Sequence, residues 1–266
     1  MSRTSDPTPL RDGLGLPVAV PRPVRRIVSL VPSLTETVAR SAPGLLVGAT
    51  DWCTHPAGLD VVRVRGTKNP DVDRVVSLAP DLVLANFEEN RQADLDALRA
   101  AGLTVWVTVI RTVDEAFGAL ARMLAACGVE LPAWLERAEA VWREPFGGRR
   151  RAAVVPIWRR PWMVLGSGTF AGDVLARLGV DNVYGASPER YPRVPLAELL
   201  AAPAELVVLP DEPYAFSADD GPESFPGRQV ALVSGRHLTW YGPSLVEARD
   251  VLVRQLAAAA EKPGTA

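Results

Sequence analysis

Two short apolar runs, separated by a segment with helical spacing, constrain the fold of this chain more than any other feature. The runs are Asp81–Ala85 (DLVLA) and Thr104–Val109 (TVWVTV), and each has the length of a buried strand. Between them Leu95 and Leu98 recur at helical spacing, and Gly102 is placed to end the helix. A strand, a helix and a strand within about 30 residues form a right-handed crossover onto a parallel sheet. The sequence therefore predicts an α/β fold.

Polar and aromatic residues follow the first of these strands. Ligands of parallel sheets bind beyond the carboxyl ends of the strands, so the side chains there are candidate ligand contacts. They are Asn86, Phe87, Glu88 and Glu89. Either glutamate could bind a cation or accept a hydrogen bond from a ligand. Alternatively, both are solvated carboxylates favoured by the dipole of the helix that follows.

The same strand and helix pattern occurs before and after this stretch. Arg25–Val31 and Leu45–Ala49 are predicted strands, and Pro145–Arg151 (PFGGRRR) is predicted to be a turn between two domains. Further strands are expected at Leu206–Leu209 and Gln229–Val233. We therefore expect two lobes, each built on a parallel sheet.

Composition limits the possible partners. The net charge of −2 over 266 residues gives no electrostatic basis for binding nucleic acid. No apolar run reaches the roughly 18 residues of a membrane span. Prolines interrupt the first 26 residues, which lack the apolar core of a secretion signal. As encoded, the chain is expected to be a cytoplasmic monomer without a transmembrane segment.

Four residues of the first lobe are further candidates. Ser33 and Glu36 fit a capping box at the start of a helix, whose free amide groups could also face the ligand. Asp51 follows the second strand, and Lys68 lies in the turn GTKNPD. Lys68 could meet an anionic group of a ligand, or it could be a solvated lysine.

The loop after the second strand contains Trp52, Cys53 and His55 in a chain with 2 histidines and 2 cysteines. Cys53 and His55 could bind a metal, but a complete site would need carboxylates such as Glu36, Glu88 or Glu89. Alternatively, Trp52 forms the apolar wall of a ligand pocket, or the loop is ordinary packing.

Aromatic residues and arginines gather in three loops of the second half. Arg159 and Arg160 could clamp a carboxylate or a phosphate, and the aromatic side chains could cover a flat or bulky ligand. The aromatic candidates are Trp158, Trp162, Tyr214, Phe216, Trp240 and Tyr241.

Several longer motifs resemble a known family, the class III substrate-binding proteins of metal-chelate ABC importers, also called helical-backbone metal receptors. In the first half the matching runs are RIVSLVPSLTETV, VGATDWCTHP and GTKNPDVDRVVSLAPDLVLANFEEN. In the second half they are VLGSGTFAGDVLARLGVDNVY, PLAELLAAPAELVVLPDEP and WYGPSLVEARDVL. The resemblance covers roughly Arg25–Leu256, and the cobalamin-binding subgroup is the nearest.

The resemblance implies two Rossmann-like lobes with parallel sheets, joined by a bridging α-helix, with a ligand cleft between the lobes. The expected divisions are an irregular segment at 1–24, a lobe at 25–111, a helical bridge at 112–148 and a second lobe at 149–266. It also implies a protein that is not an enzyme, requires no cofactor and binds cobalamin, a siderophore or another metal chelate. Members of the family are ordinarily extracytoplasmic. They dock on an ABC transporter permease through one exposed acid per lobe, for which Asp73 and Glu198 are the candidates here.

Two alternatives remain open from the sequence. The first is a cytoplasmic enzyme or chaperone of metal or tetrapyrrole handling, using Cys53, His55 and nearby carboxylates. The second is a relic whose aromatic side chains fill their own pocket.

Overall fold

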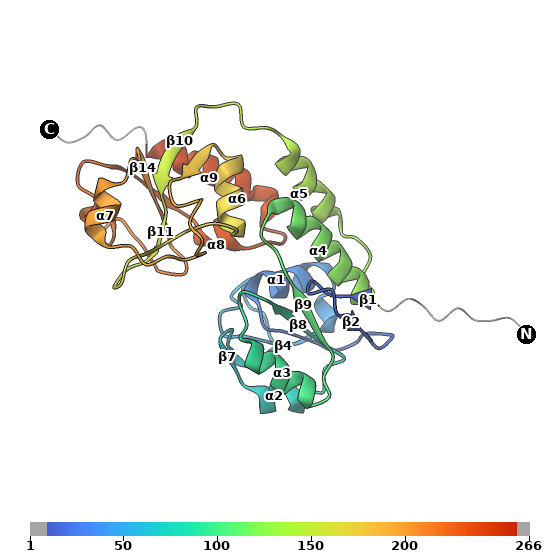
Figure 1. The fold of residues 1–266 in the computed structure, drawn as a ribbon. Helices are drawn as coiled ribbons and strands as arrows, with labels where there is room; N and C mark the ends of the chain where they lie inside the picture. The colour runs from blue at the N-terminus through green and yellow to red at the C-terminus, as the bar shows by residue number, and fades with distance from the viewer. Residues whose placement is uncertain (1–9, 260–266) are drawn as a thin grey trace, which may run out of the picture. The chain divides into compact units, whose positions relative to one another are not determined.

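The computed structural model describes residues 10–259, which form two compact units (Figure 1). Unit 1 comprises the chain up to Ile110 together with Phe117–Ala133, and unit 2 comprises Arg111–Ala116 together with the chain from Trp134 onward. Helix α4 (Val113–Ala126) therefore contributes residues to both units.

Unit 1 is built on a sheet of five parallel strands. In spatial order they are β5 (Val62–Arg63), β4 (Leu46–Ala49), β3 (Ile27–Ser29), β8 (Leu82–Asn86) and β9 (Val105–Thr108). Its helices are α1 (Pro32–Ser41), α2 (Val72–Ser77) and α3 (Gln92–Ala100), with a 3-10 turn at Pro43–Leu45. Helix α1 lies on one side of the strands, and α2 and α3 lie on the other (Figure 1).

Burial on both faces of the sheet explains why β8 is apolar throughout. Val83 and Ala85 share one core cluster with Leu95 and Leu98 of α3. Leu84 alternates to the opposite face of the strand and is also fully buried. A strand covered on both faces reads as a continuous apolar run, as is typical of parallel sheets.

Two small hairpins of unit 1 were not predicted. One pairs β1 (Leu10–Arg11) with β2 (Pro17–Val18), and the other pairs β6 (Arg65–Gly66) with β7 (Asn69–Pro70). In the first hairpin the buried Asp12 carboxylate accepts hydrogen bonds from the amides of Leu14 (2.9 Å) and Leu16 (3.0 Å). The Gly13 amide donates to the carbonyl of Val107 in β9 at 2.7 Å. A Cβ atom at Gly13 would lie 2.5 Å from the Val109 amide nitrogen, so this approach requires glycine.

Unit 2 is built on a sheet of four parallel strands. In spatial order they are β13 (Val180–Asn182), β10 (Arg151–Val154), β14 (Leu206–Pro210) and β15 (Gln229–Val233). A separate antiparallel pair is formed by β11 (Pro156–Trp158) and β12 (Met163–Val164). The helices of unit 2 are α5 (Ala133–Arg143), α6 (Phe170–Arg177), α7 (Leu196–Ala201), α8 (Gly235–Thr239) and α9 (Leu245–Ala258), with a 3-10 turn at Pro222–Ser224. The predicted α/β class with two parallel sheets is confirmed.

The predicted capping box at the start of α1 is wrong. Pro32 occupies the first helical position, where its missing amide hydrogen costs nothing, and Val31 is the N-cap residue. Ser33 therefore lies inside the first turn, buried, where its carbonyl accepts a hydrogen bond from the hydroxyl of Thr37 at 2.9 Å. Helix α2 has a side-chain cap, because the Asp71 carboxylate accepts a hydrogen bond from the amide of Arg74 at 3.1 Å.

The first turn of α4 is held by side chains of α6 within unit 2. The Asp173 carboxylate accepts hydrogen bonds from the Val113 amide at 2.8 Å and from Arg177 at 2.9 Å. Arg177 also donates to Asp114 of α4 at 2.7 Å. One carboxylate thus satisfies an amide at a helix start and orients the arginine that contacts the same turn.

Replacing Asp173 with alanine is expected to lower the free energy of unfolding by about 1–2 kcal/mol, because both hydrogen bonds are lost. Urea unfolding followed by circular dichroism measures the change. Glu139→Ala is the control, since Glu139 pairs with Arg143 on the surface of α5 and should change stability by no more than about 0.5 kcal/mol. Equal effects of the two substitutions would contradict the role assigned to Asp173.

Candidate ligand-binding site

The loop after β8 is shaped by the side chain of Asn86. Its amide group donates to the Thr108 hydroxyl at 3.1 Å, and its oxygen accepts from the amides of Glu88 (2.8 Å) and Glu89 (3.2 Å). The residue is 2% exposed. Asn86 was predicted to contact a ligand, but both ends of its amide are used inside the protein. We therefore assign it to loop structure.

A second asparagine fixes the far end of this loop. The Asn90 side-chain oxygen accepts from the Asn86 amide at 2.9 Å, and its nitrogen donates to the carbonyls of Thr67 (2.9 Å) and Leu30 (3.4 Å). Asn90 is buried. From the sequence, Asn90 was expected at the ligand rim with the other residues that follow the strand, although an asparagine between a strand and a helix is also a recognised turn signal.

Three loops of unit 1 are linked at the carboxyl ends of its strands. The Asp51 amide donates to the Arg65 carbonyl at 2.8 Å, and the Lys68 amine donates to the Glu88 carbonyl. A Cβ atom at residue 66 would lie 3.3 Å from the indole nitrogen of Trp52, so this ring lies beside the glycine. The loops that sequence analysis selected separately are thus one connected surface.

Two aromatic side chains project from these linked loops. Trp52 is 67% exposed and Phe87 is 48% exposed, which is unusual for residues of their size. Lys68 is exposed beside them, and Glu88 and Glu89 are partly buried. We call Trp52, Lys68, Phe87, Glu88 and Glu89 the unit 1 rim. It combines apolar surface with charged groups, which suits a large ligand with polar edges.

Burial raises the pKa of Glu89, and the positive charge of Lys68 only partly opposes this. The folded protein therefore binds more protons at Glu89 than the unfolded chain does once the pH exceeds the ordinary glutamate value. The stability that Glu89 contributes is present below that value and is lost as the pH rises through its pKa in the folded state.

We expect Glu89→Gln to remove this component of the pH dependence. The free energy of unfolding of the wild-type protein, measured relative to the variant, should fall as the pH rises from about 4.5. Urea titrations at a series of pH values measure the difference. Asp60→Asn, at an exposed position of the same unit, is the control for the loss of one carboxylate. A difference that does not change with pH, or that rises, would refute the prediction.

The structure gives no support for a metal site built on Cys53 and His55. Cys53 is fully buried, its sulfur lies 2.9 Å from the Thr35 hydroxyl and 3.1 Å from that of Thr50, and burial raises the pKa of its thiol. A thiol held in the protonated form is a poor metal ligand. Glu36 is buried in α1. Within the part of the chain that the structure describes, no group of three or more His, Cys, Asp or Glu side chains could hold a metal ion.

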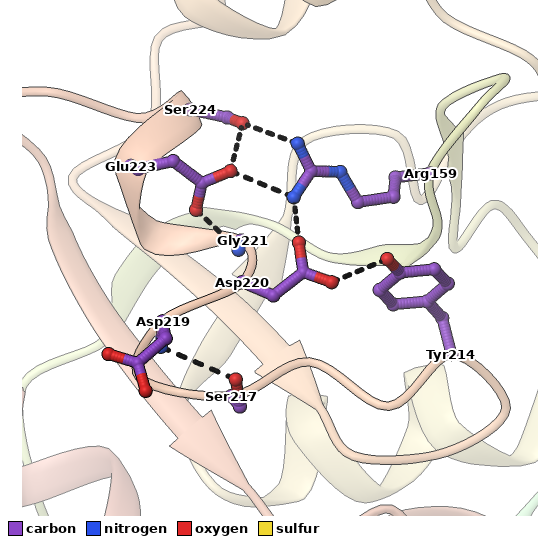
Figure 2. A network of polar contacts seen from close by, with 8 residues as sticks. All are labelled: Arg159, Tyr214, Ser217, Asp219, Asp220, Gly221, Glu223 and Ser224. Carbon is purple, nitrogen blue, oxygen red and sulfur yellow. Dashed lines mark hydrogen bonds and ion pairs between the residues drawn. The ribbon is translucent and has the colours of Figure 1, made fainter.

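A cluster of charged and hydroxyl groups surrounds Arg159 in unit 2 (Figure 2). The guanidinium donates to Asp220, to Glu223 at 2.8 Å and to the Ser224 hydroxyl at 3.4 Å. The Tyr214 hydroxyl donates to the second oxygen of Asp220 at 2.6 Å. We call these five residues the Arg159 network.

The predicted role of Arg159 as a clamp for a ligand anion is therefore not supported. Burial works against its charge, but the hydrogen bond and charge of Glu223, together with Asp220, raise the pKa of the guanidinium. Arg159 is already paired with two carboxylates that sequence reasoning missed, in the run DDGPES. Arg160, in contrast, is exposed.

Four predicted aromatic residues form a contiguous cluster next to this network. Trp158 meets Tyr214 edge to face at 5.6 Å between ring centroids, and Tyr214 lies 4.6 Å from Phe216. Phe216 stacks on Trp162 at 6.1 Å. Phe216 is buried in the core, whereas Trp158 is 42% exposed. Trp158 and the partly buried Tyr214 are therefore the members of the set that can reach a ligand from this loop.

Trp240 and Tyr241 pack inside unit 2. The Trp240 indole donates to the Glu212 carboxylate at 3.0 Å, and Tyr241 meets Phe170 edge to face at 5.6 Å. Both are buried. The first residues of the predicted loop at 237–242 belong to helix α8, and Trp240 is the residue that follows the helix. The two candidate docking acids, Asp73 in α2 and Glu198 in α7, are both exposed.

Comparison with known proteins places these features in context. No model of a known protein family matches the chain. It is 24% identical over 198 residues to a vitamin B12-binding protein of Vibrio cholerae, covering 71% of this chain and 72% of the relative. It is also 24% identical over 250 residues to a vitamin B12-binding protein of Pectobacterium carotovorum, covering 88% and 89%. An uncharacterised ABC transporter substrate-binding lipoprotein of Bacillus subtilis is 35% identical over 129 residues, which is 47% of this chain and 41% of that protein.

Solved structures share the fold. The periplasmic vitamin B12-binding protein of Vibrio cholerae aligns with a TM-score of 0.73 at 19% identity, covering 90% of this chain and 99% of that one. The Helicobacter pylori protein CeuE, solved with Ni(II) bound, aligns with a TM-score of 0.76 at 15% identity, covering 94% and 89%. A periplasmic haem-binding protein solved with two haems aligns at 0.68 and 22% identity, covering 88% and 98%.

The resemblance predicted from the sequence motifs is confirmed, both in sequence similarity and in fold. The expectation of a cytoplasmic location is not supported, because the relatives are named as periplasmic proteins or, in one case, a lipoprotein. Among residues 10–259, no helix combines the length and the hydrophobicity needed to cross a membrane.

Proposed function

We propose that this protein is the substrate-binding component of an ABC importer of the metal-chelate class, and that it binds a corrinoid such as cobalamin. One observation carries the proposal. The similarity to a vitamin B12-binding protein extends over 88% of the chain. A protein of this kind binds without catalysis, and its partner is a membrane permease.

The chemistry of the unit 1 rim supports a chelate of this size. A corrin ring is broad and largely apolar, and amide groups project from its edge. Exposed aromatic faces suit the ring, and charged or amide-bearing loops suit the edge. In unit 2 we assign the corresponding role to Trp158 and Tyr214. Asp73 and Glu198 are proposed to contact the permease.

Titration of the purified protein tests the proposal directly. Cyanocobalamin, hemin and a ferric siderophore are added separately, and binding is followed by quenching of tryptophan fluorescence and by calorimetry. We expect saturable binding of cyanocobalamin with one ligand per chain. Failure of all three chelates to bind would overturn the proposed function. Saturable binding of hemin or the siderophore alone would keep the chelate class but reject the corrinoid.

A further inference from the structure

The Arg159 network has more negative than positive charge. One guanidinium faces two carboxylates, Asp220 and Glu223, so the network as a whole is negative by one charge. Burial opposes the ionisation of Glu223, but hydrogen bonds from the Gly221 amide and from Arg159 outweigh it and lower its pKa. The two carboxylates thus neutralise Arg159 and leave one excess negative charge within the network, which includes Tyr214 through its hydrogen bond to Asp220 (Figure 2).

Both terminal nitrogens of the Arg159 guanidinium are already engaged within unit 2. One terminal nitrogen serves both carboxylates, and the other faces Ser224. The Nε atom is buried and makes no hydrogen bond within residues 10–259. The guanidinium carbon lies over the Trp162 ring, 5.2 Å from its centroid, in a cation–π contact. Binding a ligand carboxylate in the usual two-bond geometry would require these contacts to break.

The unit 1 rim repeats this balance of charge. Its single cation, Lys68, donates to the backbone carbonyl of Glu88, and the side chains of Glu88 and Glu89 lie in the same loop. Neither set of candidate ligand contacts therefore has more cations than carboxylates: unit 2 has Arg159 and Arg160 against Asp220 and Glu223, and the unit 1 rim has Lys68 against Glu88 and Glu89. Neither set offers the surplus of positive charge that a polyanionic ligand requires.

We infer that the protein selects chelates without net negative charge, and that Asp220 and Glu223 are specificity-determining residues because they neutralise Arg159. The inference rests on the proposed function and narrows its ligand class. A corrinoid whose edge carries only neutral amides is accepted. Chelates with free carboxylates, such as the propionates of haem, are disfavoured.

A matched pair of ligands tests this selectivity. Cyanocobalamin carries no net charge, and its monocarboxylic acid, in which one edge amide is hydrolysed, differs by a single negative charge. We expect the wild-type protein to bind the amide form at least about three-fold more tightly, the effect of one charge near another in water. The ratio of the two affinities, amide form over acid, should fall as the salt concentration rises.

Variants assign the effect to named residues. Asp220→Asn and Glu223→Gln should each reduce the ratio between the two ligands by about three-fold, because Arg159 gains a free donor and the loop loses a negative charge. Arg159→Gln, which keeps both carboxylates, should increase the ratio. Asp181→Asn is the matched control, since it removes a carboxylate paired with Arg150 on the surface of the same unit and should leave the ratio unchanged.

Each outcome is decisive. Equal or tighter binding of the acid by the wild-type protein would overturn the inference and leave the proposed function intact. An unchanged ratio in Asp220→Asn and Glu223→Gln, in variants shown to be folded by thermal unfolding, would overturn the roles of these two residues. Binding of hemin without any corrinoid would overturn the charge selectivity and the corrinoid assignment, and would keep the metal-chelate class of the proposed function. Absence of binding to every chelate would overturn the inference and the proposed function together.

Discussion

Replacing Asn90 with alanine is expected to lower the free energy of unfolding by about 3 kcal/mol. The residue is buried and its amide joins the end of β3, the β6–β7 turn and the end of β8 through three hydrogen bonds. Alanine would leave the Asn86 amide and the Thr67 carbonyl without their partner, and each unsatisfied buried group costs about 1–3 kcal/mol. Urea unfolding followed by circular dichroism measures the loss.

Two further variants make the Asn90 result interpretable. Asn90→Asp keeps the acceptor for the Asn86 amide but loses the donor, so it should be intermediate in stability. Gln92→Ala changes an exposed amide at the start of α3 and should cost no more than about 0.5 kcal/mol. A loss below about 1 kcal/mol for Asn90→Ala would show that the three loops hold together without this amide.

The double substitution Trp52→Ala and Phe87→Ala is expected to weaken cyanocobalamin binding by about 100-fold. Aromatic side chains dominate binding energy at contact surfaces, and losing two of them removes about 2–3 kcal/mol. Both are exposed, so the free energy of unfolding should change by less than about 1 kcal/mol. Calorimetric titration measures the affinity, and urea unfolding checks the stability.

The control for this double variant is Leu131→Ala. Leu131 is 57% exposed in unit 1 but belongs to none of the strand-end loops. The substitution Leu131→Ala should leave the affinity for cyanocobalamin unchanged. If the double variant binds cyanocobalamin as the wild-type protein does, the unit 1 rim does not form the ligand contact.

The β8–α3–β9 unit could be predicted because its strand and helix patterns lie within one short stretch of the sequence. The predicted strands Asp81–Ala85 and Thr104–Val109 correspond to β8 and β9 within one residue at each end. A strand that is buried on both faces needs apolar side chains at consecutive positions, so its sequence is an apolar run. The two-residue hairpins β1–β2 and β6–β7 were missed because strands of that length have no measurable periodicity.

The candidate site was predicted in part, for reasons that differ from residue to residue. Trp52 and Phe87 follow strand ends, and that position alone is enough to expect exposure. Asn86 follows the same rule, but it is still the last residue of β8, paired with Thr108, and so faces inward. Arg159 could not be assigned, because its partners lie 61 and 64 residues further along the chain. Only the folded structure shows that its charge is already compensated.

The contact between Gly13 and Val107 has a consequence for solubility. Strand β9 is the last of its sheet, and its outer backbone groups would otherwise be available to a strand of another molecule. The β1–β2 hairpin occupies part of that edge through the Gly13 amide and the Asp12 carboxylate. A chain trimmed to begin after Val18 would expose an apolar border open to intermolecular pairing, and such borders promote aggregation. The β1–β2 hairpin, at the start of the described chain, thus reduces self-association of the protein.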